Sequence, residues 1–198
     1  MYNSKQIAAV MLNDIVGHDD VSEQGIHIAL KKKETYKKIS QALVAQHFGK
    51  VFNGIETGSI CLFDSSIDAV NCAVSIQKYI NQNADFQLRV GIHTGDVEIN
   101  QGEPKGDAVS FASLVTHQAP PGGICISENV YKSVNRKEGL SFEPIYLNGK
   151  KKEIEHDLYQ ILSDGIVSNE DGRPITLRWY FVALVAMISI VIGAILSF

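Results

Sequence analysis

Asp14 is the residue in this sequence best placed to take part in chemistry, because it closely follows the apolar run 8–12. An apolar run of this length is typical of a buried strand. A carboxylate at the end of such a strand is costly to desolvate unless it has a partner, usually a cation. Taken alone, Asp14 is explained as well by capping of the turn that follows. The spacing of later residues favours the interpretation as a metal ligand.

Other polar residues are weaker candidates for chemistry. His93 lies near the end of a predicted strand, beside Gly95, where a structural role is favoured over that of a catalytic base. The run 18–20, His-Asp-Asp, could bind a cation, although such loops are more often solvated or cap the next helix. The sequence contains no CxxC pair and no phosphate-loop glycine pattern. Three cysteines in apolar runs are predicted to be small buried residues of a protein from a reducing compartment: Cys61, Cys72 and Cys125.

Length and charge limit the class of protein. The 198 residues suffice for one domain of about 150–165 residues with an appendage. A net charge of −4 is not that of a nucleic-acid-binding protein, so no nucleic-acid partner is expected. The basic run 31–33, with Lys37 and Lys38, lies on a helical pattern and is predicted to be a solvated face.

Strands and helices alternate in the pattern predicted for residues 1–162. We expect strands at 6–15, 49–53, 59–63, 86–94, 97–99, 123–127, 141–146 and 158–162, and helices at 24–47, 66–83, 106–119 and 128–134. Gly95 and Asp96 are predicted to form a turn, and 101–105 a polar loop. Ser65 with Asp68 has the spacing of a capping box. The order predicts an α+β fold with a ferredoxin-like βαββαβ core, which does not by itself determine function.

The C-terminal residues 179–198 are predicted to cross a membrane. They contain no charged side chain, and a helix of twenty residues spans about 30 Å, the thickness of the hydrocarbon core of a bilayer. Arg178, Trp179 and Tyr180 at its start are typical of a cytoplasmic membrane interface. We therefore expect a domain at 1–162, a polar linker at 163–178 and a single C-terminal anchor that holds the domain at the cytoplasmic side.

Four blocks in this chain resemble the class III adenylate/guanylate cyclase catalytic domain. They are Met-Leu-Asn-Asp-Ile at 11–15, the hairpin at 49–63, Arg-Val-Gly-Ile-His-Thr-Gly at 89–95, and Gly-Asp-Ala-Val at 106–109 leading to 121–127. The resemblance runs from about residue 6 to residue 162. It implies attack of a ribose 3′ hydroxyl on the α-phosphorus of a nucleoside triphosphate, assisted by two cations. It also implies a head-to-tail dimer with its sites between the two chains.

The implied metal site is incomplete. The resemblance assigns Asp14 as the first metal ligand, joined by the backbone carbonyl of Ile15. The second carboxylate should lie at the hairpin tip, where the sequence has Thr57, a neutral and weak ligand for Mg²⁺. Glu56 could substitute only if the turn slipped by one residue, which would place side chains on the opposite face. Binding of Mg²⁺ or Mn²⁺ is therefore expected to be weak.

The residues that the partner chain should contribute also differ from the family pattern. The partner-side Asn position is Ser110 and the partner-side Arg position is Leu114. Leucine cannot donate a hydrogen bond to phosphate, and loss of such a charge clamp costs several orders of magnitude in rate. The purine-reading Lys position is Asn53, with Glu103 as its acidic companion, which argues against an ordinary adenylate cyclase. The resemblance implies nucleotide contacts at Asn53, Glu103, Asp107 and Ser110.

These departures favour a membrane-anchored, catalytically degenerate cyclase-like protein over an enzyme. Its ligand would be a nucleotide or cyclic nucleotide, bound in a homodimer or in a heterodimer with another cyclase-like chain, and its role that of a sensor, regulator or effector in signalling. Two alternatives stay open. One is an active nucleotide cyclase with altered substrate choice that uses Glu56 with Asp14. The other is the non-catalytic subunit of a cyclase heterodimer.

Overall fold

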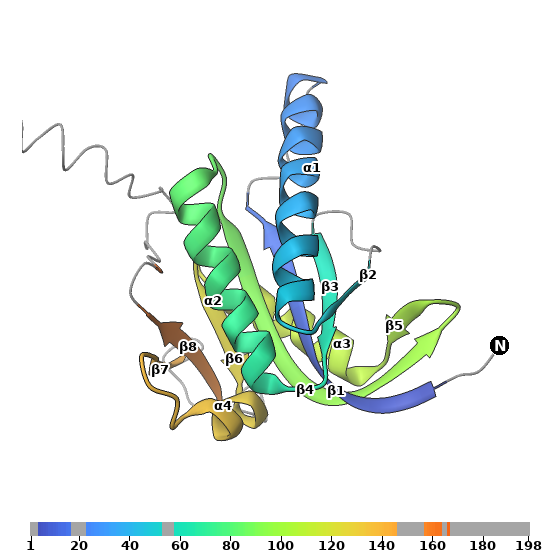
Figure 1. Ribbon diagram of the computed structural model, residues 1–198, viewed down its shortest axis with the longest axis vertical. Coiled ribbons are helices and arrows are strands. Elements are labelled where there is room, and N and C mark those ends of the chain that lie inside the picture. The colour runs from blue at the N-terminus through green and yellow to red at the C-terminus, as the bar shows by residue number, and fades with distance from the viewer. Residues whose placement is uncertain (1–3, 17–22, 53–57, 146–156, 164–165, 167–198) are drawn as a thin grey trace, which may run out of the picture.

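A computed structural model of the chain describes residues 4–16, 23–52, 58–145, 157–163 and 166 (Figure 1). Its strands are β1 (Ser4–Ile15), β2 (Lys50–Phe52), β3 (Gly58–Phe63), β4 (Leu88–Asn100), β5 (Glu103–Lys105), β6 (Ile124–Ser127), β7 (Ser141–Ile145) and β8 (Leu158–Leu162). Its helices are α1 (Glu23–Gln46), α2 (Ser66–Asn83), α3 (Asp107–Gln118) and α4 (Glu128–Val134).

The strands form one sheet in the order β2-β3-β1-β4-β6-β8-β7, with β5 paired to β4. The first four of these strands have the antiparallel order of a ferredoxin-like βαββαβ unit. The α+β prediction is therefore confirmed. β6 extends the sheet in parallel with β4, and β8 and β7 complete that edge as an antiparallel pair.

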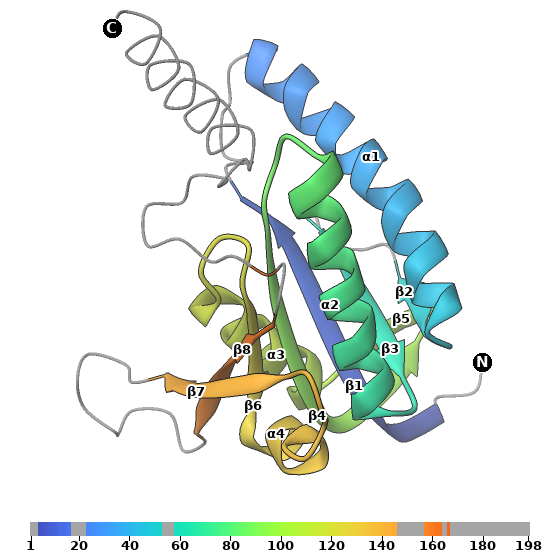
Figure 2. The ribbon, with the colours of Figure 1, turned by 60° about the vertical axis from the view of Figure 1, so that its left-hand side comes forward.

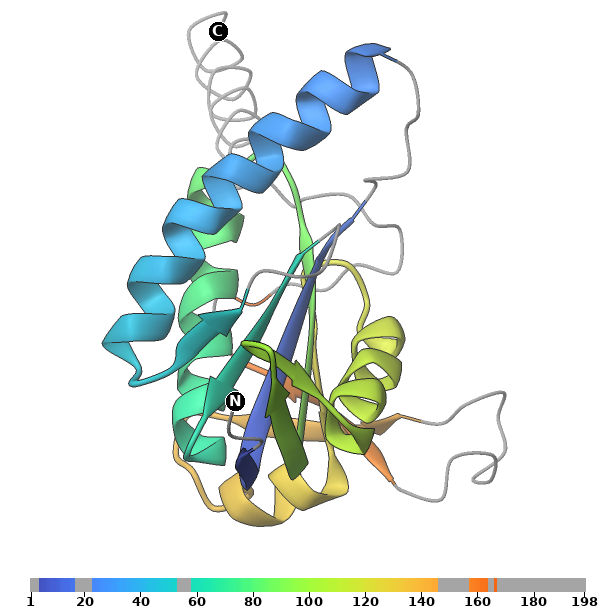
Figure 3. The same ribbon diagram turned by 90° about the vertical axis from the view of Figure 1, so that its right-hand side faces the viewer.

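Helices cover the two faces of this sheet separately. Figure 3 shows α1 and α2 on one side and α3 alone on the other, with the sheet between them. The larger apolar cluster fills the side beneath α1 and α2, and includes Met11, Phe63 and Ile76. A smaller cluster lies beneath α3 and includes Val10 and Leu12. β1 contributes alternate residues to both clusters, which explains why its sequence is apolar at successive positions.

α3 lies unusually close to β4 because of Gly91. A Cβ at this position would overlap the backbone nitrogen and the hydroxyl of Thr116 in α3. At the other end of α3, Ala108 lies beside Gly95 of β4. α3 therefore runs antiparallel to β4, with its C-terminal turns toward residue 91 and its N-terminus toward residue 95.

Two predictions around β4 are wrong. Gly95 and Asp96 do not form a turn, because they pair with Ala8 and Ile7 of the long strand β1, which keeps β4 extended to Asn100. The stretch 101–105 is not a polar loop, because Glu103–Lys105 forms β5. The connection is a two-residue turn in which Gln101 and Gly102 have φ values of 54° and 83°, as in a type I′ hairpin.

The predicted helix starts differ in how they are capped. Ser65 caps α2, since its hydroxyl accepts hydrogen bonds from the backbone N–H groups of Ile67 and Asp68. Ser127 precedes α4 but makes no such bond; its hydroxyl instead bonds the His93 ring at 2.9 Å.

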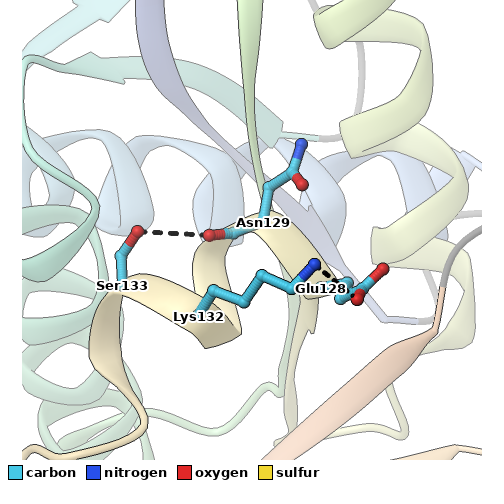
Figure 4. Close-up of polar contacts among 4 residues, drawn as sticks. All are labelled: Glu128, Asn129, Lys132 and Ser133. Atoms are coloured by element: carbon cyan, nitrogen blue, oxygen red, sulfur yellow. Dashed lines mark hydrogen bonds and ion pairs between the residues drawn. The ribbon is translucent and has the colours of Figure 1, made fainter.

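Within α4, Lys132 pairs with Glu128 at 2.7 Å, and the Ser133 hydroxyl donates to the Asn129 carbonyl (Figure 4). The carboxylate of Glu128 raises the pKa of Lys132, although this pair is solvent-exposed and contributes little to stability.

In the part of the chain that the structure describes, no helix is both long enough and apolar enough to cross a membrane. The anchor predicted at 179–198 lies outside the described residues, as does most of the predicted linker. The domain boundaries at 162 and 178 therefore stay predictions.

All three cysteines are buried and unpaired, as expected from their apolar surroundings. Burial raises the pKa of the Cys61 and Cys125 thiols to about 12, and it also raises the pKa of Cys72. Thiols with such pKa values are almost entirely protonated near neutral pH, so they are poor nucleophiles.

These thiols predict a loss of stability at alkaline pH. An unfolded thiol ionises near pH 8.5, whereas the native Cys125 thiol keeps its proton up to about pH 12. Above pH 8.5 ionisation therefore favours the unfolded chain, and each thiol lowers the free energy of unfolding by about 1.4 kcal/mol per pH unit. Denaturant titrations from about pH 9 to about pH 10.5 give the free energy of unfolding at each pH. Its decline with pH should be less steep for Cys125→Ala than for the unmodified chain, by this amount. Equal slopes for the variant and the unmodified chain would contradict the assignment.

Candidate functional site

Asp14 lies at the end of β1, between two neighbouring strands. Its Cα partners are Gly58 on β3 and Arg89 on β4. Side chains alternate along a strand, and Leu12 packs in the cluster beneath α3. Asp14 therefore faces the α3 side of the sheet, where it is half-buried.

Gly58 allows β3 to approach β1 closely at this point. A Cβ at Gly58 would overlap the carbonyl oxygen of Asn13, so a larger residue would push the hairpin away from Asp14. Thr57, the expected second metal position, directly precedes Gly58 in the sequence. Thr57, Glu56 and Asn53 all lie outside the described residues, so their arrangement around Asp14 stays a prediction.

Arg89 is a candidate site residue that the sequence interpretation missed. It is the cross-strand partner of Asp14, so both side chains project from the same face of the sheet. Its Nε atom is buried and has no hydrogen-bond partner. Within the described part of the chain, neither Arg89 nor Asp14 forms an ion pair. The signal was present in the sequence, because an arginine between Leu88 and Val90 of a buried strand requires an anionic partner.

A carboxylate and a guanidinium that face the same side without pairing offer binding groups of both signs. Asp14 can bind a cation, and Arg89 can bind the oxygens of a phosphate. The described residues contain no group of three or more His, Cys, Asp or Glu side chains able to hold a metal ion by themselves. Mg²⁺ commonly takes one or two carboxylates and completes its shell with phosphate oxygens and water. The residues present therefore fit a cation that arrives with a phosphorylated ligand.

A groove lies along α3 beside this strand end. It has a volume of about 560 Å³, and its lining residues are mostly apolar or uncharged: Leu12, Ile60, Val109, Ser110, Ser113, Leu114 and His117. Ser110 and Leu114, the two positions predicted to face a partner chain, are one helical turn apart and line the same groove. Leu114 is 51% exposed, which is high for a leucine. None of these described lining residues is an arginine or a lysine, so none of them supplies the charge clamp for phosphate that the resemblance implies.

The other predicted nucleotide contacts lie farther from Asp14. Glu103 is in β5 and pairs with Lys105 at 3.6 Å, where both side chains are exposed. β5 joins β4 at Asn100, eleven residues from Arg89, or about 36 Å along an extended strand. Asp107 occupies the first turn of α3, at the end remote from Thr116, where a carboxylate stabilises the helix dipole. Within a single chain, Glu103 is therefore not brought together with Asp14.

His93 has structural contacts, in agreement with the structural role favoured from the sequence. Its Nδ1 bonds the Ser127 hydroxyl at 2.9 Å, and its ring lies 4.5 Å from that of Phe111. The residues 18–20 lie outside the described part of the chain.

A buried polar cluster supports the strand ends from the α1 side. The Tyr36 hydroxyl of α1 lies 2.7 Å from the Ser59 hydroxyl of β3, and Asn13 Nδ2 of β1 donates to Ser59 at 3.5 Å. Burial raises the pKa of Tyr36 well above its usual value of 10.0, so this hydroxyl stays neutral. Asn13 and Ser59 are themselves Cα partners, and they immediately adjoin the pair Asp14 and Gly58. The cluster thus joins α1, β1 and β3 at the level of the site.

Removal of the Tyr36 hydroxyl should destabilise the domain. Tyr36→Phe leaves Ser59 with longer contacts to Asn13 and Cys61, both at 3.5 Å, at an expected cost of about 1–2 kcal/mol in the free energy of unfolding. Tyr79→Phe, on an exposed tyrosine, is the matched control and should change stability by less than about 0.5 kcal/mol. Denaturant unfolding of both variants measures the difference, and a Tyr36→Phe effect no larger than the control would refute the role of the cluster.

A double-mutant cycle that combines Tyr36→Phe with Ser59→Ala measures the interaction energy between the two hydroxyls. We expect a coupling energy of about 0.5–1.5 kcal/mol, since the two hydroxyls are in direct contact.

Comparison with known proteins identifies relatives of this domain. A sequence model described as "Adenylate and Guanylate cyclase catalytic domain" matches residues 2–160. The Rhizobium meliloti (strain 1021) protein named "Putative adenylate cyclase 3" is 28% identical over 148 residues, which are 70% of this chain and 25% of that protein. The Myxococcus xanthus "Serine/threonine-protein kinase pkn2" is 26% identical over 161 residues, which are 76% of this chain and 19% of that protein. The chain thus spans a quarter or less of the length of these two relatives.

Solved structures have the same fold. An adenylate/guanylate cyclase/hydrolase from Silicibacter pomeroyi superposes with a TM-score of 0.70 at 24% identity, over 81% of this chain and 99% of that one. An unconventional dimer of the guanylyl cyclase domain of the RhoGC fusion protein from Blastocladiella emersonii has a TM-score of 0.67 at 19% identity, over 81% and 98%. The guanylate cyclase domain of RhGC from Catenaria anguillulae, in complex with GTP, has a TM-score of 0.64 at 19% identity, also over 81% and 98%. Homologous domains are thus known as dimers and bind nucleotides.

Proposed function

The chain belongs to the adenylate and guanylate cyclase catalytic domain family, and on that premise we propose that it binds a nucleotide for signalling rather than for cyclisation. The observation that carries this proposal is Leu114. The sequence resemblance assigns Leu114 to the position of the partner-side arginine, and the described residues that line its groove include no arginine or lysine. Without such a cation, charge that develops on the phosphates during cyclisation would not be stabilised.

Asp14 and Arg89 support the binding half of the proposal. They face the same side of the sheet from adjacent strands, and neither forms an ion pair with a described residue. A nucleotide with a bound Mg²⁺ or Mn²⁺ supplies both missing partners: the cation to Asp14 and phosphate oxygens to Arg89. The cation would neutralise phosphate charge, while Arg89 would orient the phosphate chain.

The family resemblance supports a dimer, because it assigns Ser110 and Leu114 of each chain to the site that the other chain's Asp14 begins. The partner would be a second copy or another cyclase-like chain. The uncharged segment 179–198 supports attachment to a membrane, with the domain at the cytoplasmic side. In this proposal, occupancy of the dimer cleft by a nucleotide or cyclic nucleotide is transmitted to the membrane segment. The protein then acts as a sensor, regulator or effector.

Two alternatives differ from this proposal in their products and partners. An active cyclase with altered substrate choice would use Glu56 with Asp14, and it would release a cyclic nucleotide and pyrophosphate. A non-catalytic subunit would stabilise a true cyclase, and it would be recovered from native membranes together with that enzyme.

The unmodified full chain should form no cyclic product from any of the four common nucleoside triphosphates with Mn²⁺. Restoring the family residues in Thr57→Asp/Ser110→Asn/Leu114→Arg should raise the rate of cyclic-nucleotide formation by about a thousandfold or more, because it replaces a metal ligand and the charge clamp. The same triple variant with Asp14→Ala is the control and should lose the gain. Chromatography of the reaction products measures cyclic-nucleotide formation by the unmodified chain, the triple variant and the control. Cyclic product from the unmodified chain that disappears in Asp14→Ala would overturn the proposal and favour the cyclase alternative.

Nucleotide binding should depend on Arg89. Arg89→Gln removes a charged donor to phosphate, and we expect the affinity of the full chain for a Mn²⁺–nucleotide to fall about 10- to 100-fold. Arg136→Gln, on an exposed arginine just beyond α4, is the control and should leave the affinity unchanged. Isothermal titration gives both dissociation constants. Equal affinities for the two variants would remove Arg89 from the site.

A further inference from the structure

Aliphatic side chains are exposed on the first half of α1. Ile26 and Ile28 are each 49% exposed, and Leu30 is 54% exposed. The opposite side of the same helix is buried, with Ala29 and Tyr36 almost without solvent contact. The apolar inner face of the helix is therefore already covered, and the three exposed side chains do not belong to it. Ile26 and Leu30 lie on one side, whereas Ile28, two residues from Ile26, points in nearly the opposite direction.

Exposed lysines lie among these aliphatic residues. Lys31, Lys37 and Lys38 are all exposed. Residues four and seven apart share a side of a helix, so Ile26, Leu30 and Lys37 lie in one row. Lys31 and Lys38, also seven apart, form a second row. Five lysines against two glutamates give α1 a net charge of +3, in a chain whose net charge is −4.

The position of α1 leaves this side accessible. The helix packs against α2 and β2, and its other side faces outward in Figures 2 and 3. Its N-terminal half extends beyond the end of α2 in both views. A flat surface could therefore contact α1 without displacing another described helix.

We propose that this face of α1 binds the surface of an anionic lipid bilayer. The face consists of Ile26, Leu30, Lys31, Lys37 and Lys38, with the exposed Glu34 between the two rows. Aliphatic side chains gain by entering the boundary between headgroups and acyl chains, and lysines beside them reach the negative headgroups with their long stems. The exposed aliphatic side chains meet the first requirement, and the exposed lysines beside them meet the second. The proposal concerns a surface separate from Asp14 and Arg89, so it does not rest on the proposed nucleotide binding.

A nucleic acid or another acidic macromolecule fits this face less well. A nucleic acid or a polyanion such as heparin offers no apolar region for Ile26 and Leu30. α1 contains no arginine, and its tyrosine is buried, so the helix lacks the groups that usually stack on bases. Charge complementarity together with aliphatic exposure therefore favours lipid.

A fluorescent probe on the full chain tests this contact. The probe is the environment-sensitive dye NBD on His27→Cys, since His27 is exposed between the two rows. The three native thiols are buried, with pKa values that burial raises, so labelling should be confined to the new cysteine. A second chain labelled at Arg136→Cys reports on an exposed position just beyond α4.

The labelled chain is added to vesicles of phosphatidylcholine alone, or with about one quarter phosphatidylglycerol. Flotation measures total attachment, to which residues 179–198 also contribute, whereas NBD emission reports only whether the labelled site has left water. We expect a blue shift for the probe at residue 27 with anionic vesicles only, weakened by high salt, and no shift for the probe at residue 136.

Matched variants separate the contributions of charge and apolar surface. The first variant is Lys31→Gln/Lys37→Gln/Lys38→Gln. It should lower the equilibrium constant for binding of the labelled face to anionic vesicles about 100-fold, or about fivefold per lysine. Lys50→Gln/Arg136→Gln/Lys137→Gln removes the same number of charges elsewhere and should lower it far less. Ile26→Ser/Leu30→Ser should abolish the blue shift.

Three results would overturn the proposal. The first is equal emission from residue 27 in anionic vesicles, in neutral vesicles and in buffer. The second is an equal effect of the two charge variants. The third is a full blue shift with soluble heparin in the absence of lipid, which would assign the face to an acidic macromolecule. A loss of nucleotide binding would change none of these readouts.

Discussion

The pairing of β1 on both edges is the constraint on which the rest of this domain depends. β1 pairs with β3 along one edge and with β4 along the other, and it is apolar on both faces because helices cover both. This double register places Asp14 between Gly58 and Arg89. A one-residue shift of either neighbour would turn its side chains to the opposite face of the sheet, which would separate Arg89 from Asp14. The hydroxyl pair of Tyr36 and Ser59 and the close packing at Gly58 both act at this level, so they hold the register where the site is.

The site that results is asymmetric in charge. The strand ends retain one carboxylate and one guanidinium, whereas the groove along α3 presents apolar and uncharged side chains where the family resemblance expects an amide and a guanidinium. Electrostatic stabilisation of a developing charge requires groups already in place, and Leu114 cannot supply it. Recognition of a phosphorylated ligand requires less, because Arg89 and a cation on Asp14 suffice to contact phosphate oxygens. The proposed function therefore assigns this scaffold a binding role that does not require the groups used for cyclisation.

α1 contributes to the protein on both of its sides. Its inner side supplies Tyr36 to the buried cluster at the site, and its outer side presents lysines with aliphatic residues between them. A surface bound to the outer side would be coupled to the register of β1 and β3 through one rigid helix. In such an arrangement, the state of the cleft and the position of the domain relative to a membrane would influence one another.

Sequence alone determined the order of the four helices and of every strand except β5, although it divided β4 in two, and it also determined the α+β class, the capping of α2 by Ser65 and the position of Asp14 at a strand end. These features follow from local periodicity, capping chemistry and motif spacing, which depend on residues close together in the chain. Local reasoning failed at Gly95 and Asp96, where glycine suggested a turn. The long edge of β1 offers hydrogen bonds that keep β4 extended there, and this edge is remote in sequence.

Tertiary structure decided which remote residues meet at the site. Arg89 is 75 positions from Asp14, and only the register of β1 with β4 makes them neighbours on one face. The groove that joins Leu114 of α3 to Leu12 of β1 likewise depends on how a helix packs on the sheet. Such contacts are set by side-chain packing and strand register between distant segments, and local residue patterns do not specify them.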